Sequence, residues 1–181
     1  KKRRLDSILF GAAQECVELV FNYDFRVTKQ FDPNKNPAVR QKAIQYILDY
    51  WRIVRECMPE LWADIEKMPN LNQRRSKDHP GTRAFDYRLL EETGIRAFSK
   101  LASELFSTTW ISGAGSPGFE KIKIYLTEMS KREKVVRVLT KPKVDKTVLD
   151  IDPDLKSTGK AGVEAIFRHL KAELQQVIQD N

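Results

Sequence analysis

The residues that most invite a chemical interpretation are Ser157-Thr158-Gly159-Lys160, which open a predicted helix. A P-loop needs a glycine five residues before its Gly-Lys pair and a Ser or Thr directly after the lysine, because backbone amides must wrap the phosphates while the hydroxyl meets magnesium. Those two positions hold Asp154 and Ala161. We therefore interpret the stretch as a Ser or Thr helix cap and not as a nucleotide site.

Two further segments resemble ligand loops in part. The run from Ser112 to Gly118 could hold an anion at the N-terminus of the following helix, although a plain helix–helix connection explains it better. Asp150-x-Asp152-x-Asp154 resembles the start of a calcium loop. It lacks the glycine at the sixth position and the glutamate at the twelfth, so we expect a solvated turn and no metal site.

Catalytic groups cannot be assembled from sequence spacing. His79 and His169 have no cysteine or second histidine nearby, and the adjacent Glu91 and Glu92 would not face each other on a helix. The sequence thus predicts no catalytic residue and no cofactor, and it favours a protein that is not an enzyme.

Positive charge is the feature that remains: the chain has a net charge of +7, and its positive charges are concentrated in three segments. They are residues 1–4, residues 74–83 and residues 131–146, whereas the rest of the chain is net negative. Such segregation suits a surface that binds a polyanion, and it also occurs on ordinary solvated loops.

The third segment favours phosphate contacts, because its cations alternate with small apolar residues and not with aromatic rings that could stack on bases. We expect nucleic acid, most readily duplex DNA, to meet two groups of cations. The main group is Lys131, Arg132, Lys134, Arg137, Lys141 and Lys143, and the secondary group is Arg74, Arg75, Lys77 and Arg83.

Apolar periodicity predicts the elements that must position these cations. Helices are expected near residues 5–21, 37–58, 61–65, 86–105, 117–130 and 160–179, with a mobile polar loop at about 69–84. Valines among lysines suggest a small β element or an extended basic arm near 133–148. The fold class is mainly α: an orthogonal bundle of five to seven helices around one core.

Residues 37–58 give the clearest pattern, with a predicted apolar stripe formed by Ile44, Ile47, Leu48, Trp51, Val54 and Met58. Pro37 suits the first helical position, where its missing N–H is harmless. Gly94 interrupts the helix predicted from residue 86, and its spacing from Leu90 and Leu101 places it on the buried side.

Length and composition indicate the class of protein, its compartment and its domain organisation. The chain has 181 residues, of which 41% are hydrophobic and 31% charged, and no apolar run reaches the ~20 residues of a membrane span. Cys16 and Cys57 are expected to be reduced core thiols of an intracellular protein, with a disulfide as the alternative. We expect a single domain over residues 1–181 that is a fragment of a longer chain, because the first residue is not Met.

The segment FDYRLLEETGIRAFSKLASELFSTTWISGAGSPGFEKIKIYL, residues 85–126, contains the pattern LL-x-x-TG-x-x-AF followed by a Trp–Gly-rich loop. With Trp51 to Pro59 upstream, it resembles the C-terminal helical part of DGQHR-domain proteins, which include DndB-like regulators of DNA phosphorothioate modification. The Asp-Gly-Gln-His-Arg run that names that family is absent, so no site residue carries over. The resemblance implies a bacterial-type, DNA-associated role.

These observations predict a DNA-binding regulatory or accessory module, linked to DNA modification or defence. One alternative is a helical protein-interaction domain of a larger complex, with an exposed apolar patch around Trp110, Ile111 and Phe119. Another is the non-catalytic part of an enzyme. The expected partners are nucleic acid and a further protein, but no membrane.

Overall fold

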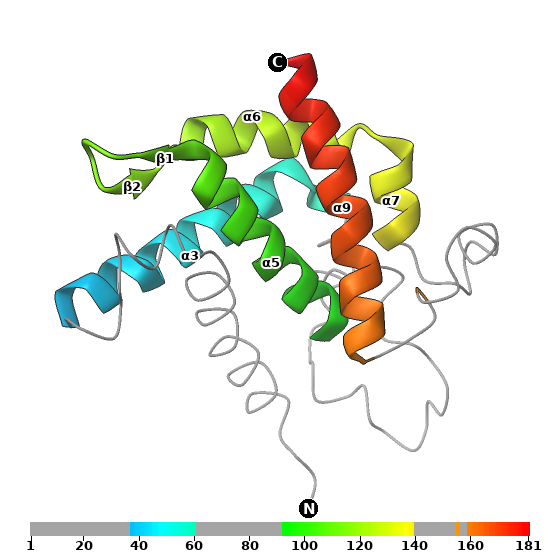
Figure 1. Ribbon diagram of the computed structural model, residues 1–181, viewed down its shortest axis with the longest axis horizontal. Coiled ribbons are helices and arrows are strands. Elements are labelled where there is room, and N and C mark those ends of the chain that lie inside the picture. Colours follow the sequence, from blue (N-terminus) through cyan, green and yellow to red (C-terminus); the bar gives the residue numbers. More distant parts are fainter. Residues whose placement is uncertain (1–36, 61–91, 140–154, 156–158) are drawn as a thin grey trace, which may run out of the picture.

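The chain folds mainly into helices in a computed structural model, which describes residues 37–60, 92–139, 155 and 159–181 (Figure 1). The described helices are α3 (Pro37–Cys57), α5 (Glu92–Thr109), α6 (Phe119–Ser130), α7 (Glu133–Leu139) and α9 (Lys160–Asp180). Strands β1 (Trp110–Ile111) and β2 (Ser116–Pro117) form an antiparallel hairpin between α5 and α6. The predicted mainly α fold is confirmed.

Helix α3 begins at Pro37, as predicted, but its buried stripe differs from the predicted one. The buried residues are Ala43, Ile47, Tyr50, Val54 and, just beyond the helix, Met58. The predicted core positions Ile44 and Leu48 are instead 43% and 55% exposed. Each follows a buried residue and is therefore rotated from it by about 100° around the helix.

Tyr50 explains why the stripe takes this course. Its ring is buried, and its hydroxyl donates a hydrogen bond of 2.9 Å to the backbone carbonyl of Phe98 in α5. A buried tyrosine needs such a partner for its polar end. Position 50 is thus fixed against α5, and the neighbouring positions follow from the helical period.

Helix α5 lies in the middle of the molecule, between α3 and α9 (Figure 1). Its side chains at Ala97, Phe98, Leu101, Ala102 and Leu105 are fully buried, and the next residue in the chain, Phe106, is buried as well. Helix α9 packs along α5 and also contacts α6 and α7. The buried side chains of the described residues form one core to which all five helices contribute.

The hairpin connects α5 to α6 through a tightly packed turn. The N–H of Gly118 donates to the carbonyl of Thr109 at 2.9 Å, and Gly115 adopts a φ of 61°. Tyr46 of α3 covers this turn: its hydroxyl donates to the Gly115 carbonyl at 3.1 Å, and its ring lies 5.8 Å from that of Phe119. The Gly/Ser segment therefore connects two helices and packs against a third.

Helix α7 corrects the prediction of a strand or extended arm over residues 133–148. Residues Glu133–Leu139 are helical, and the buried residues are Val135, Val138 and Leu139. Their spacing of three and one is helical and does not alternate as in a strand. Burial against α6 and α9 outweighs the strand preference of valine, because tertiary packing overrides propensity.

Several predictions fall outside the described residues. They concern the helices near 5–21 and 61–65, the loop at 69–84, Cys16, residues 140–148 and most of the aspartate-rich turn. In the part of the chain that the structure describes, no helix combines the length and apolar character that a membrane crossing requires.

Gly94 lies buried near the start of α5, as its spacing predicted. We expect Gly94→Ala to lower the free energy of unfolding by ~1–3 kcal/mol, because an added methyl group overpacks a filled core. Urea denaturation measures this change. If the midpoint rises instead, the helix gains more from alanine than the contact loses, and close packing at position 94 is refuted.

Gly118→Ala tests the turn between the hairpin and α6. A Cβ at position 118 would lie 2.9 Å from the Thr109 carbonyl oxygen, so the backbone must shift. We expect a loss of ~1–3 kcal/mol of unfolding free energy by chemical denaturation. Gly113→Ala is the control, since a Cβ there meets no heavy atom within 4 Å. Equal effects of the two variants would contradict the tight contact.

Candidate functional site

The candidate site is the corner where α6 ends and α7 begins, and we name it the basic corner: Lys131, Arg132, Lys134 and Arg137. Lys131 is the C-cap of α6: its backbone N–H donates to the carbonyl of Glu128, and the next N–H, of Arg132, donates to the carbonyl of Met129. The structure brings these four of the ten predicted phosphate ligands together on one turn and the short helix that follows. The other six, Lys141, Lys143, Arg74, Arg75, Lys77 and Arg83, lie outside the described residues.

Arg132 is held by α9. Its guanidinium donates to Gln176 Oε1 at 2.9 Å, to Glu173 Oε2 at 3.3 Å and to Asp180 Oδ2 at 2.6 Å. The Arg132 side chain is 27% exposed and the Glu173 side chain only 9%. A carboxylate buried to this degree needs a charged partner, and Arg132 provides it. This residue therefore ties α7 to the last two turns of α9.

The other three cations of the basic corner face solvent. The Lys131, Lys134 and Arg137 side chains are 62%, 75% and 43% exposed. Lys131 pairs with Glu128 at 2.6 Å and Arg137 with Glu133 at 2.5 Å, each within a turn of its own position, while Lys134 reaches Glu173 at 3.6 Å. Exposed ion pairs of this kind contribute only ~0–1 kcal/mol.

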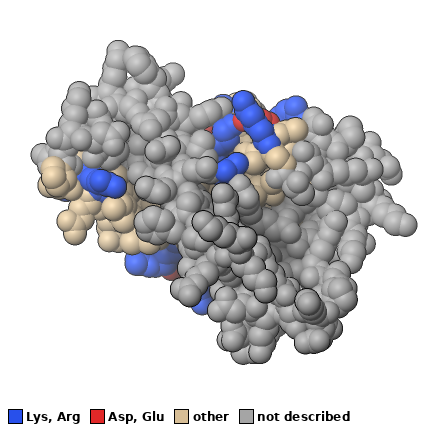
Figure 2. Space-filling model, turned by 90° about the horizontal axis from the view of Figure 1, so that it is seen from below, with Lys and Arg blue, Asp and Glu red and all other residues tan. Residues whose placement is uncertain are grey.

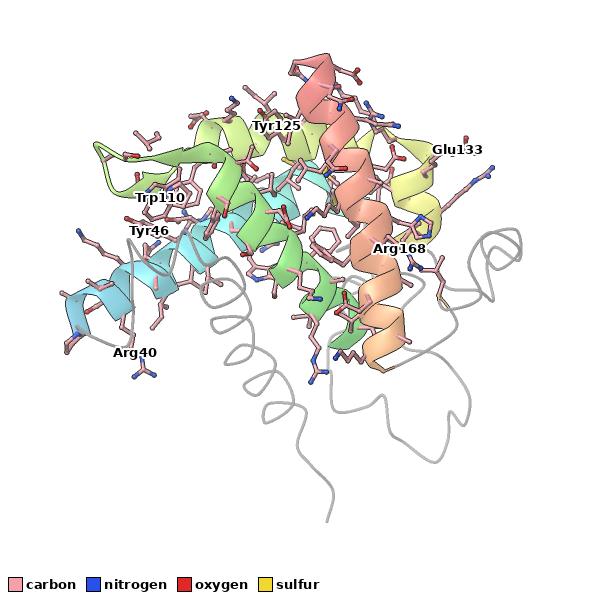
Figure 3. The ribbon with its side chains drawn as sticks, viewed as in Figure 1. Arg40, Tyr46, Trp110, Tyr125, Glu133 and Arg168 are labelled. Carbon is pink, nitrogen blue, oxygen red and sulfur yellow. The ribbon has the colours of Figure 1, made fainter. Side chains whose placement is uncertain are left out.

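Other cations lie apart from the basic corner or beside it. Arg168 is exposed and projects from α9 on the side of α7 (Figure 3). Arg40 is exposed near the start of α3, at the opposite end of the molecule (Figure 3). Figure 2 shows the described Lys and Arg side chains of one face in separate groups and not in one continuous patch.

A small open cavity of about 160 Å³ lies next to the corner, under α7. Its walls include Cys57, Met58, Val135 and Leu139, with Ser130 as one of its few polar groups. Cys57 is a half-buried free thiol, 3.3 Å from the Thr127 hydroxyl. Glu60 also lines the cavity, so its wall has one thiol, one hydroxyl and one carboxylate among apolar side chains.

Among the described residues, the pKa values of three groups away from the corner are shifted, and each shift has a structural cause. The hydrogen bond and ion pair between Lys123 and Glu56, at 2.9 Å, lower the pKa of Glu56 and raise the pKa of Lys123. Burial raises the pKa of Tyr46. The first pair links α6 to α3 and the second group closes the hairpin, so each stabilises packing.

Three further sequence predictions concern the start of α9, His169 and metal binding. Gly159 occupies the N-cap of α9, without a side-chain hydrogen bond, so the predicted Ser or Thr cap is wrong. His169 is half buried within α9. Among the described residues, no group of three or more His, Cys, Asp or Glu side chains could hold a metal ion.

The predicted apolar patch around Trp110, Ile111 and Phe119 is only partly present. Ile111 is exposed, but Trp110 and Phe119 pack against the core, where both rings contact Tyr46. The exposure of Ile44 and Leu48 was not predicted from the sequence, because an apolar residue at helical spacing is normally taken to be a core residue. The signal that could have separated them is the competing stripe through Ala43 and Tyr50.

Replacing Arg132 by glutamine tests its structural role. Arg132→Gln leaves Glu173 with only the distant Lys134, so we expect a loss of ~1–3 kcal/mol of unfolding free energy in urea denaturation. Lys134→Gln, the matched control on the same carboxylate, should change it by ~0–1 kcal/mol. Adding Glu173→Gln to Arg132→Gln should recover part of the loss. Equal losses from the two single variants would show that Arg132 is not the main partner of Glu173.

Comparisons with known proteins leave the chain without an assigned relative. A scan against protein-family models gives no match, and searches of curated proteins and of solved structures give none either. Any function of the basic corner must therefore be argued from its own geometry.

Proposed function

We propose that the chain is a DNA-binding module that contacts duplex phosphates through the basic corner. The observation that carries the proposal is the exposure of Lys131, Lys134 and Arg137 on one turn and one short helix. Their positive ends reach solvent beyond a packed apolar base formed by Val135, Val138 and Leu139. Such cations contact the DNA backbone and supply affinity without reading sequence.

The carboxylates that pair with these three residues do not prevent the cations from binding DNA phosphates instead. Glu128 and Glu133 hold Lys131 and Arg137 through exposed pairs that are weak in water. Glu173 is 3.6 Å from Lys134 and has Arg132 as a nearer partner. A duplex concentrates phosphates along its axis and releases counterions when cations bind, which gives a larger driving force than one surface carboxylate. The lysines and the arginine can therefore turn from protein to phosphate at little cost.

Arg132 has a different role in this proposal from the one that its sequence position predicted. Its three acceptors on α9 keep the guanidinium in place, so we expect it to position α7 and not to contact phosphate. Cations mounted on a fixed helix lose less conformational freedom on binding than cations on a loose arm.

The biological setting is also a proposal: a regulatory or accessory part of DNA modification or defence. The resemblance of residues 85–126 to DGQHR-domain proteins supports it. Lys141 and Lys143 follow the basic corner directly in the chain, and the segment with Arg74, Arg75, Lys77 and Arg83 adds a second group of cations. We propose that these six cations contact DNA phosphates as well.

A charge-matched pair of variants tests the proposal. The triple variant Lys131→Gln, Lys134→Gln, Arg137→Gln should bind a 30-base-pair duplex of mixed sequence (about three helical turns) more weakly at low salt. The slope of log affinity against log salt should fall by about 3, one unit for each lost phosphate contact. Fluorescence anisotropy from 50 to 200 mM salt, a range of the order over which such contacts weaken, measures both.

The control variant is Arg40→Gln, Lys42→Gln, Lys121→Gln, which removes the same charge from exposed positions on α3 and α6. It should retain most of the slope. If both variants lose binding equally, the effect is one of net charge and the basic corner is not the interface. If the parent chain does not bind duplex at 50 mM salt, the proposed function is wrong.

A further inference from the structure

Helix α3 has a second apolar side, of which only Trp51 packs against the core. Ile44 and Leu48 are 43% and 55% exposed, and they lie one turn apart on the same side of the helix. Trp51 continues the row in the next turn and is half buried, with its ring 6.2 Å from that of Phe98. The spacing of four and three residues matches the apolar anchors of helix-in-groove recognition.

Arginines flank this row, and one of them, Arg52, is paired with Asp49 at 3.0 Å in an exposed ion pair. Arg52 and Arg55 are exposed beside Leu48, and Arg40 is exposed one turn before Ile44. The two carboxylates of α3, Asp49 and Glu56, lie about 100–120° away around the helix from the apolar row. Asp49 accepts hydrogen bonds from Gln45 and Arg52, while Glu56 is paired with Lys123.

We propose that this side of α3, defined by Ile44, Leu48 and Trp51 and flanked by Arg40 and Arg52, is a docking surface for an acidic amphipathic helix of a partner protein. The apolar row offers anchors for the partner's leucine-like side chains, and the arginines match its carboxylates. Complementary charge steers association and fixes orientation, while the aliphatic contact supplies affinity.

The exposed chemistry favours a protein over other polyanions. The two exposed side chains of the row, Ile44 and Leu48, are aliphatic, and its one aromatic ring, Trp51, packs against Phe98. The surface therefore offers no open ring on which bases could stack, whereas single-stranded nucleic acid needs aromatic platforms. Burying Ile44 and Leu48 against phosphate would leave their apolar surface in a wet, charged contact. The surface also shares no residue with the basic corner, which lies between α6 and α7. The inference therefore does not depend on DNA binding.

The probe is a synthetic peptide of about 18 residues, which is five helical turns, with leucine at positions spaced by three and four and glutamate at most others. A scrambled peptide of the same composition lacks the apolar row. Fluorescence anisotropy with the 181-residue chain should show saturable binding of the periodic peptide and clearly weaker binding of the scrambled one. Hydrogen exchange should show the resulting protection on α3.

Single substitutions locate the contact. Leu48→Ser should weaken binding by about tenfold or more, since a leucine side chain loses its burial in the complex. Ile124→Ser, at a similarly exposed isoleucine of α6, should leave it unchanged. Arg52→Gln should weaken binding at low salt and have less effect at high salt. Circular dichroism of each variant should match that of the parent, because all three positions are exposed.

Four outcomes would overturn the proposal: no binding of the periodic peptide, equal binding of both peptides, equal loss from Leu48→Ser and Ile124→Ser, or protection confined to other helices. In the same assay, a duplex or an anionic vesicle (phosphatidylserine with phosphatidylcholine) should not lose affinity on Leu48→Ser. If either does, the surface binds that polyanion and not an acidic helix.

Discussion

The burial of one lysine between α5 and α9 constrains much of the architecture. Lys100 is only 5% exposed, so its charge requires compensation inside the protein. It pairs with Glu164 of α9, and its ammonium lies 5.1 Å from the ring centre of Phe167. Lys171 of α9 pairs in turn with Glu104 of α5 and approaches the same ring from 5.8 Å. These reciprocal pairs define one register for the two helices, since a shift by one residue would leave a buried charge without its partner.

The position of α9 then determines how its C-terminal end contacts the segment that begins α7. Because α5 holds the first half of α9, the residues Glu173, Gln176 and Asp180 project where the chain after α6 passes. Arg132 meets all three and thereby orients α7. A partly buried ion pair between α5 and α9 and an exposed set of cations beside α7 are thus connected through a single long helix. Helix α3 begins on the side of the molecule away from α7 and runs behind α5 toward it (Figure 1).

Sequence patterns predicted the elements better than they predicted what each side chain does. The bounds of α3, α6 and α9 follow from apolar periodicity, and so does the buried position of Gly94. The three valines of α7 misled because β-branched residues suggest strands, while only tertiary packing reveals the helix. The partner of Arg132 lies 41 residues away in sequence, so no local pattern could distinguish it from Lys131 beside it. The exposure of Leu48 likewise depends on Tyr50 reaching a carbonyl 48 residues further on.

The structure of the hairpin tip indicates where this chain can tolerate insertions. Ser112, Gly113 and Ala114 are exposed, and a side chain added at Gly113 would meet nothing. The stem below them is fixed by Tyr46 and by the Gly118–Thr109 hydrogen bond. Lengthening a flexible loop costs only about 0.6 kcal/mol for each doubling. The tip is therefore a natural point for insertions, where a lineage could add a recognition loop, or an experimenter an epitope or a fluorophore, without disturbing the helical frame.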